Sequence, residues 1–310
     1  MPVAKRQTIV VTAGVILGAA LFAYAVRGVG LDALADGARR VGWGLLVILI
    51  LGGVRFAVRA QCWRWCLPPG VPLDFQHAFS AFVAGDGVGN VTPLGLLASE
   101  PTKVLLIRHH LAPVDSVASL TLENVLYAVS VLAMLAFGCA LLLATTAVPG
   151  SAWWVAAGAL GAVLAIVAAA VMLLRSPRLA RVRSELQRFA DEHPGRLARV
   201  FSLQLLFHAL AIFETFLTLY WLLGDESPTA VQAVVFETVN RFTTVVFKFV
   251  PFRIGVDEAA SGAIAPIIAM TAAAGVTLAV VRKARTLFWS AVGLLLVLTH
   301  PAGQGSDEKP

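Results

Sequence analysis

Charged residues are scarce in this sequence. They make up 14% of 310 residues, hydrophobic residues make up 58%, and the mean hydropathy is +0.82. A soluble domain carries about 25% charged residues. Apolar runs recur at close to the roughly 20 residues that cross a hydrocarbon core as a helix. The sequence therefore predicts an all-α integral membrane protein and excludes an ordinary soluble domain.

Cysteine and the common catalytic motifs are also nearly absent. The three cysteines, Cys62, Cys66 and Cys139, have no second Cys or His pair nearby that would complete a zinc site. Neither G-x-S-x-G nor H-E-x-x-H occurs. The run GDGVGN, residues 85–90, follows no predicted strand and so does not indicate a dinucleotide site. We predict no catalytic residue, no metal and no cofactor.

The formal charge of +6 is distributed unevenly. Residues 175–199 contain seven arginines and three acidic residues. Apolar residues recur at helical spacing in this stretch, which predicts an amphipathic helix on the inner leaflet: Leu179, Val182, Leu186 and Phe189. Because Lys and Arg concentrate in cytoplasmic loops, we expect residues 175–199 to face the cytoplasm. The basic charge then indicates membrane lipids as partners, and not nucleic acid.

The apolar runs predict about six transmembrane helices in a single membrane domain, residues 1–310. The expected spans are Thr8–Val26, Trp43–Trp63, Val117–Thr145, Trp153–Leu174, Val200–Leu223 and Val276–His300. Counting from the basic cytoplasmic loop places both termini in the cytoplasm. We expect a multi-pass protein of the inner (plasma) membrane.

Two further apolar segments, His77–Glu100 and Ala230–Ala269, are interrupted by proline and glycine. Unsatisfied peptide groups cost several kcal/mol each in hydrocarbon, so a broken segment at membrane depth must be buried in protein or line a wet cavity. In both segments a glutamate follows the central proline by seven residues, Glu100 after Pro93 and Glu258 after Pro251. We predict a re-entrant hairpin at each break.

The order of the segments repeats along the chain. One repeat covers about residues 43–145 and the other about residues 200–300, and each has a span, a broken segment and a charged span. The predicted topology starts the two repeats on opposite sides of the membrane. Inverted repeats of this kind are common in secondary transporters, in which broken helices form the substrate site near the midplane.

The stretches GNVTPLGLLASEPTKVLLI, SLTLENVLYAVSVL, VPFRIGVDEAA and VVRKARTLFWSAVGLLLV resemble the flippase-like transmembrane domain of lysylphosphatidylglycerol synthases. The resemblance implies a role in moving lipids between leaflets. Two departures from the family pattern bear on the substrate: the first glutamate follows Ala98-Ser99, and Glu123-Asn124 stands where a Glu-Arg pair is common. The chain ends at SDEKP without a synthase domain, so we expect no aminoacyl transfer.

Intramembrane cations complete the predicted site. Arg55 and Arg59 lie four residues apart on one helix face. Arg55 either binds a lipid phosphate or snorkels inward, whereas for Arg59 we favour snorkelling. Arg282 and Arg285 share a side of the last span and Lys283 is turned away, and these cations either bind substrate or pair with Glu258 or other acidic groups nearby. Together with the residues that the resemblance implies, the predicted substrate-binding set is Arg55, Asn90, Pro93, Glu100, Lys103, Glu123, Pro251, Gly255, Glu258, Arg282 and Arg285.

These patterns favour a lipid transporter that is not an enzyme. It would move an anionic or lipid-linked substrate, of phospholipid, polyprenyl or hopanoid type, between leaflets. One alternative is an integral-membrane enzyme of lipid or lipid-linked sugar metabolism, with Glu100 or Glu258 as acid or base. Another is an assembly subunit without a substrate.

Overall fold

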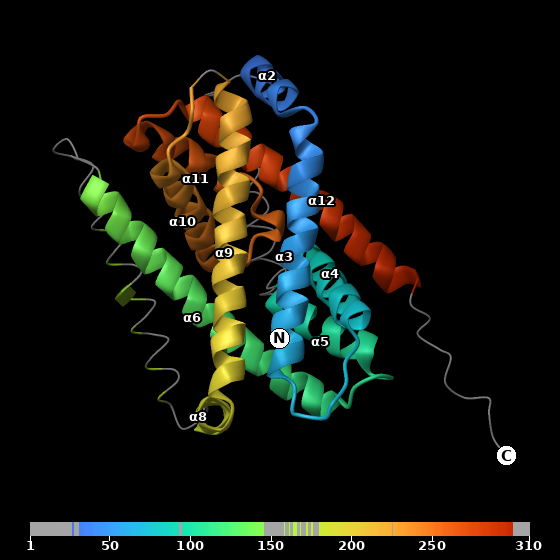
Figure 1. Ribbon diagram of the computed structural model, residues 1–310. Helices are drawn as coiled ribbons and strands as arrows, with labels where there is room; N and C mark the ends of the chain where they lie inside the picture. The colour runs from blue at the N-terminus through green and yellow to red at the C-terminus, as the bar shows by residue number, and fades with distance from the viewer. Residues whose placement is uncertain are drawn as a thin grey trace, which may run out of the picture.

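The computed structural model describes residues 31–92, 95–145, 180–224 and 226–299, together with a few isolated positions. These residues form ten α-helices and two short 3-10 helices, with no strand among them (Figure 1). The α-helices are α2 (Leu31–Val41), α3 (Gly44–Cys66), α4 (Phe75–Val91), α5 (Leu96–Ile107), α6 (Pro113–Thr145), α8 (Ala180–Glu192), α9 (Pro194–Leu223), α10 (Ala230–Val246), α11 (Val256–Ile264) and α12 (Ala272–Thr299), and the 3-10 helices are η2 (Pro251–Arg253) and η3 (Ala265–Ile268).

Three of these helices, α3, α6 and α9, are long and apolar enough to cross a membrane. They contain three of the predicted spans, namely Trp43–Trp63 except for its first residue, and all of Val117–Thr145 and Val200–Leu223. The predicted span at 276–300 lies mostly in α12, which carries three cations, at positions 282, 283 and 285, and is not one of the three. Thr8–Val26 and most of Trp153–Leu174 fall outside the described residues.

Large apolar side chains are exposed on the flanks of the long helices. Ile50 on α3 is 65% exposed, Phe137 on α6 is 59% exposed, and Leu298 on α12 is 80% exposed. Such exposure is unusual for a soluble protein, whereas in lipid the hydrocarbon solvates these side chains. The helical packing thus agrees with the composition in indicating a membrane protein.

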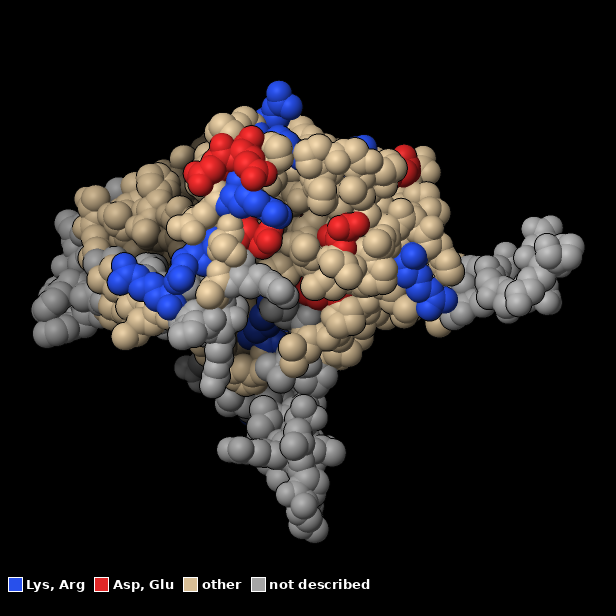
Figure 2. Space-filling model, turned by 90° about the horizontal axis from the view of Figure 1, so that it is seen from below, with Lys and Arg blue, Asp and Glu red and all other residues tan. Residues whose placement is uncertain are grey.

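The basic segment forms the predicted helix, α8. Phe189 on α8 is buried, and Leu186 packs against a core cluster formed with α3, α6 and α9. Arg183 and Arg188 are exposed on the other side. Figure 2 shows this end of the molecule, where basic and acidic side chains stand on an otherwise uncharged surface.

Both broken segments consist of two helices separated by a short interruption. Asp74 begins α4 by accepting a hydrogen bond from the Gln76 N–H at 2.9 Å, and Thr229 and Gln232 begin α10 with a reciprocal capping box. The second interruption contains η2, and Gly255 follows it with a φ of 80° that glycine adopts readily.

The two halves of the chain interlock. In Figure 1, α3 and α9 lie side by side and run in opposite directions, and they pack against each other. Helix α4 packs on α12 of the other half, and α10 packs on α6. Small residues permit both crossings: Gly293 of α12 faces the backbone of Val83, and Gly138 of α6 faces Thr238. Each broken segment is therefore held by the last long helix of the opposite half.

Candidate functional site

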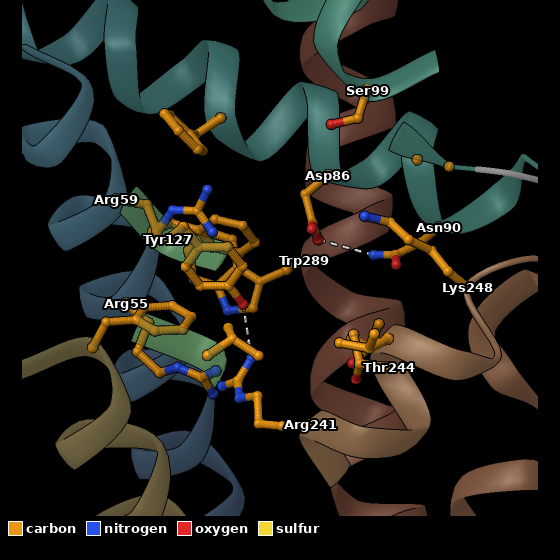
Figure 3. A pocket seen from close by; sticks show the side chains of 18 of the residues that line it. Arg55, Arg59, Asp86, Asn90, Ser99, Tyr127, Arg241, Thr244, Lys248 and Trp289 are labelled. Atoms are coloured by element: carbon orange, nitrogen blue, oxygen red, sulfur yellow. Dashed lines mark hydrogen bonds between the residues drawn. The ribbon is translucent and has the colours of Figure 1, made fainter. Parts of the chain in front are cut away.

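The two broken segments border one cavity with a volume of about 510 Å³. Its walls come from α3, α4, α5, α6, α9, α10, the interruption that contains η2, and α12. Figure 3 shows this cavity from close by. Because residues from both halves line it, the cavity exists only when the whole bundle is assembled.

Cationic side chains outnumber carboxylates on the cavity wall. Seven cations line it, namely Arg55, Arg59, Lys103, Arg241, Lys248, Arg253 and Arg285. Only two carboxylates do so, those of Asp86 and Glu100. A cavity of this composition attracts anions, because charges in a low-dielectric site interact more strongly than in water.

Carboxylates just behind the wall hold the arginines in place. Glu214 on α9 accepts from Arg55 on α3 at 2.9 Å and also pairs with Arg285 on α12. Glu123 on α6 binds Arg59 through two hydrogen bonds, of 2.6 and 2.7 Å. Bidentate pairs of this kind are among the stronger charge-assisted hydrogen bonds. The arginines are therefore oriented before any ligand arrives.

Arg241 joins the same wall from α10. It donates to the Tyr127 hydroxyl at 3.1 Å and forms an ion pair with Glu237 at 2.8 Å. Its guanidinium lies 5.0 Å from the centre of the Phe207 ring, and that of Arg55 lies 4.6 Å from the same ring. Aromatic faces stabilise cations at such distances.

The buried arginines retain unused hydrogen-bond donors. Arg55 is 9% exposed and Arg241 is 6% exposed. The Nε atoms of Arg55 and Arg241 have no hydrogen-bond partner among the described residues. A buried donor without a partner costs about 1–3 kcal/mol. An oxyanion or water in the cavity would remove this cost.

The broken segments supply another wall. Asp86 accepts from the Asn90 amide at 2.8 Å, and Lys103 donates to Glu100 at 2.8 Å. Lys248 lies just after the last residue of α10. It is the one cation lining the cavity that makes no ion pair with a described residue. Figure 3 shows Asp86 and Asn90 apart from Arg55, Arg59 and Arg241.

The structure brings five of the predicted site residues to the cavity: Arg55, Asn90, Glu100, Lys103 and Arg285. Two others lie one layer behind, Glu123 as the partner of Arg59 and Arg282 as a partner of Glu237 at 3.0 Å. Pro251 begins η2 next to the lining residue Phe252. Pro93 lies outside the described residues.

Glu258 does not lie where we expected it. It is 1% exposed, accepts from the Gly255 N–H at 2.8 Å and lies 3.7 Å from Lys283. Glu258 thus caps the N-terminus of α11 at Gly255, and neither residue lines the cavity. Of the acidic groups expected to pair with the cations of the last span, Arg282 pairs with Glu237 and Arg285 with Glu214, and Glu258 pairs with Lys283.

Several lining residues were not in the predicted set, namely Arg59, Asp86, Tyr127, Arg241, Lys248 and Trp289. Snorkelling was the wrong interpretation for Arg59, because it pairs with Glu123 inside the bundle. Glu237, Asn240 and Arg241 recur at helical spacing, and in the structure Asn240 donates to Glu237 and Arg241 pairs with it. The same spacing could have placed Arg241 on the site, because a buried charge in a membrane segment is usually functional.

Among the described residues, no group of three His, Cys, Asp or Glu side chains is arranged to hold a metal ion. The fold and the cavity define a polytopic helical membrane protein with a cationic internal site. The chain belongs to the family described as the lysylphosphatidylglycerol synthase TM region, whose model matches residues 11–293. The resemblance noted in the sequence is thereby confirmed. No curated protein and no solved structure matched the chain.

Proposed function

We propose that this protein moves a lipid with an anionic headgroup between the leaflets of the inner membrane. The family is a membrane domain associated with lipid metabolism or flipping, which supports this assignment. The observation that carries it is the cationic cavity with the partnerless buried donors of Arg55 and Arg241. A lipid phosphate fits these donors, because guanidinium groups bind phosphate oxygens through paired hydrogen bonds.

The same arrangement supports an inverted repeat. Helices α3–α6 and α9–α12 each contain a long helix, a broken pair and a second long helix, and the first helices run in opposite directions (Figure 1). We infer that α4–α5 enters from the cytoplasm and α10–α11 from outside, with the cavity between them. Broken helices at a repeat interface form the substrate site in many transporters.

Transport accounts for the cavity better than catalysis does. Each cavity arginine is paired to a carboxylate from another helix or one turn away, which holds charge in place without activating a nucleophile. The lining carboxylate of Glu100 is paired with Lys103. We therefore assign the cavity to binding and passage of a headgroup.

The test is lipid movement in proteoliposomes. Purified protein should accelerate the exchange of fluorescent anionic phospholipids between leaflets, measured by quenching of the outer-leaflet label. Lys248→Gln should slow it roughly fivefold, as expected for one charged contact to a phosphate. Lys248 suits this test because its removal leaves no described carboxylate unpaired.

Arg39→Gln is the matched control, because Arg39 is exposed on α2 and lies outside the cavity. It should exchange lipids at the wild-type rate. If the wild type accelerates none of the phospholipid or polyprenyl phosphate lipids tested, transport is the wrong function. Chemical conversion of a lipid by the wild type would instead establish the enzyme alternative.

A further inference from the structure

The short turn η2 has a strained backbone. Phe252 and Arg253 follow each other in the chain with φ values of 50° and 49°, in the left-handed region. Among the described residues, only these two and Ala269 have a positive φ without being glycine. The left-handed conformation is unfavourable for them because it brings the Cβ atom too close to a carbonyl oxygen. Strained turns persist where the surrounding contacts hold them in place.

Side chains of α11 and α12 hold η2 in this conformation. The Lys283 ammonium on α12 donates to the Phe252 carbonyl oxygen and pairs with Asp257 on α11 at 3.2 Å. The Arg253 Nε–H is shared between the two oxygens of Asp257, at 3.1 Å from each. The Thr243 hydroxyl donates to the same carboxylate at 2.9 Å. Lys283 and Asp257 thus fix the carbonyl of one strained residue and the side chain of the other.

The strained turn is also part of the cavity wall. Phe252 and Arg253 both line the cavity, and η2 packs against α4, the first helix of the other broken segment. Figure 3 shows Lys248, which precedes η2, on the side of the cavity where Asn90 of α4 lies. A movement of η2 away from α4 would therefore take two side chains off the wall and open the cavity between the two broken segments.

We propose that η2 is a gate of this cavity, and that Lys283 and Asp257 latch it in the strained, closed conformation. When the contacts of Lys283 break, Phe252 and Arg253 return to negative φ values and η2 leaves α4. Gly255, with a φ of 80°, separates η2 from α11 and acts as the hinge, since glycine adopts either sign of φ readily. This inference goes beyond the proposed function, because it concerns a change of conformation and not the movement of a lipid.

The strain makes a latch a better description than a permanent brace. Breaking the contacts of Lys283 is unfavourable, but the relaxation of two left-handed residues offsets part of that cost. The closed and open conformations are therefore closer in free energy than the ion pairs alone would make them. When two conformations lie close in free energy, a single substitution changes their populations measurably.

The experiment measures the position of η2 directly. In the full-length protein without its native cysteines, spin labels are attached to cysteines at Val91, the last residue of α4, and at Ile254, which follows η2. Both positions are exposed. Double electron–electron resonance in lipid nanodiscs gives the distances between the labels. We expect one main distance with the wild-type latch and a second, longer one in Lys283→Gln. The ratio of open to closed protein should increase about tenfold, as for the loss of one charged hydrogen bond.

A pair of variants separates the strain from the loss of a side chain. Phe252→Gly and Phe252→Ala both remove the ring, but only glycine adopts a φ of 50° without strain. In the Lys283→Gln background, the glycine variant should populate the closed conformation about fivefold more than the alanine variant. Arg282→Gln is the matched control on α12, because Arg282 pairs with Glu237 and not with η2. It should show the wild-type distance.

The same single distance in Lys283→Gln and in the wild type would overturn the latch. Equal populations in the glycine and alanine variants would show that η2 stores no strain, which also overturns the proposal. If Lys283→Gln does not fold, Asp257→Asn tests the same latch, because asparagine keeps the size of the side chain and loses its charge. It too should populate the longer distance, and its failure to do so would overturn the latch. These outcomes do not depend on the proposed function, since no lipid movement is measured.

Discussion

The crossing of α4 and α12 should not tolerate a single added methyl group. An alanine Cβ at Gly293 would lie 2.2 Å from the Val83 carbonyl oxygen and 3.2 Å from the Ala84 Cα, where ordinary contacts are 3.4–4 Å. Both obstacles are backbone atoms, so no side-chain rotation relieves the clash and the helices must separate by roughly 1 Å. Overpacking of this kind costs about 1–3 kcal/mol.

Alanine also favours a helix over glycine by up to about 1 kcal/mol, which offsets part of the cost. We therefore expect Gly293→Ala to lower the free energy of unfolding by about 1–2 kcal/mol. The measurement is thermal unfolding of the detergent-solubilised protein, followed by loss of the monodisperse species. Lipid binding should weaken as well, because Asp86 on α4 and Trp289 on α12 both line the cavity.

Gly195→Ala is the control for this prediction. An alanine Cβ at Gly195, in the first turn of α9, meets nothing within 4 Å, so only helix propensity acts there. Its melting temperature should equal or exceed that of the wild type. Equal melting temperatures for Gly293→Ala and the wild type would refute the close crossing and, with it, the interlocking of the two halves.

Three further changes test the arrangement. In a cysteine-free background, cysteines placed at the exposed positions Val91 and Ile254 should react with impermeant reagents from opposite sides of the membrane. Reaction of both cysteines from one side would refute the inverted repeat. Glu214→Gln should lower the free energy of unfolding by about 2 kcal/mol, because two buried arginines lose the carboxylate that they share. An unchanged melting temperature would show that this cluster does not stabilise the bundle. Glu258→Ala should cost about 1 kcal/mol through the lost hydrogen bond to the Gly255 N–H, while lipid binding stays the same, and a binding defect would place Glu258 on the substrate path.

The sequence by itself determined the class of protein and its main elements. Composition and apolar run length identified a helical membrane protein, and three of the predicted spans lie in α3, α6 and α9. The prolines and glycines predicted the interruption that contains η2, and short motifs identified the family. These properties are local, since they depend on residues a few positions apart and on the strict requirement of hydrocarbon for satisfied backbone groups.

Only the tertiary structure decided which charges meet. Arg59 pairs with Glu123, Arg55 pairs with Glu214, and among the cations of the last span it is Lys283 that lies near Glu258. The partners of the first two pairs lie on other helices, 64 and 159 residues away in the sequence. The physical reason is that a membrane helix is apolar on nearly every side, so its periodicity does not reveal which face turns inward. Close crossings such as that at Gly293 set the rotation of each helix instead. The rotation in turn determines which residues line the cavity.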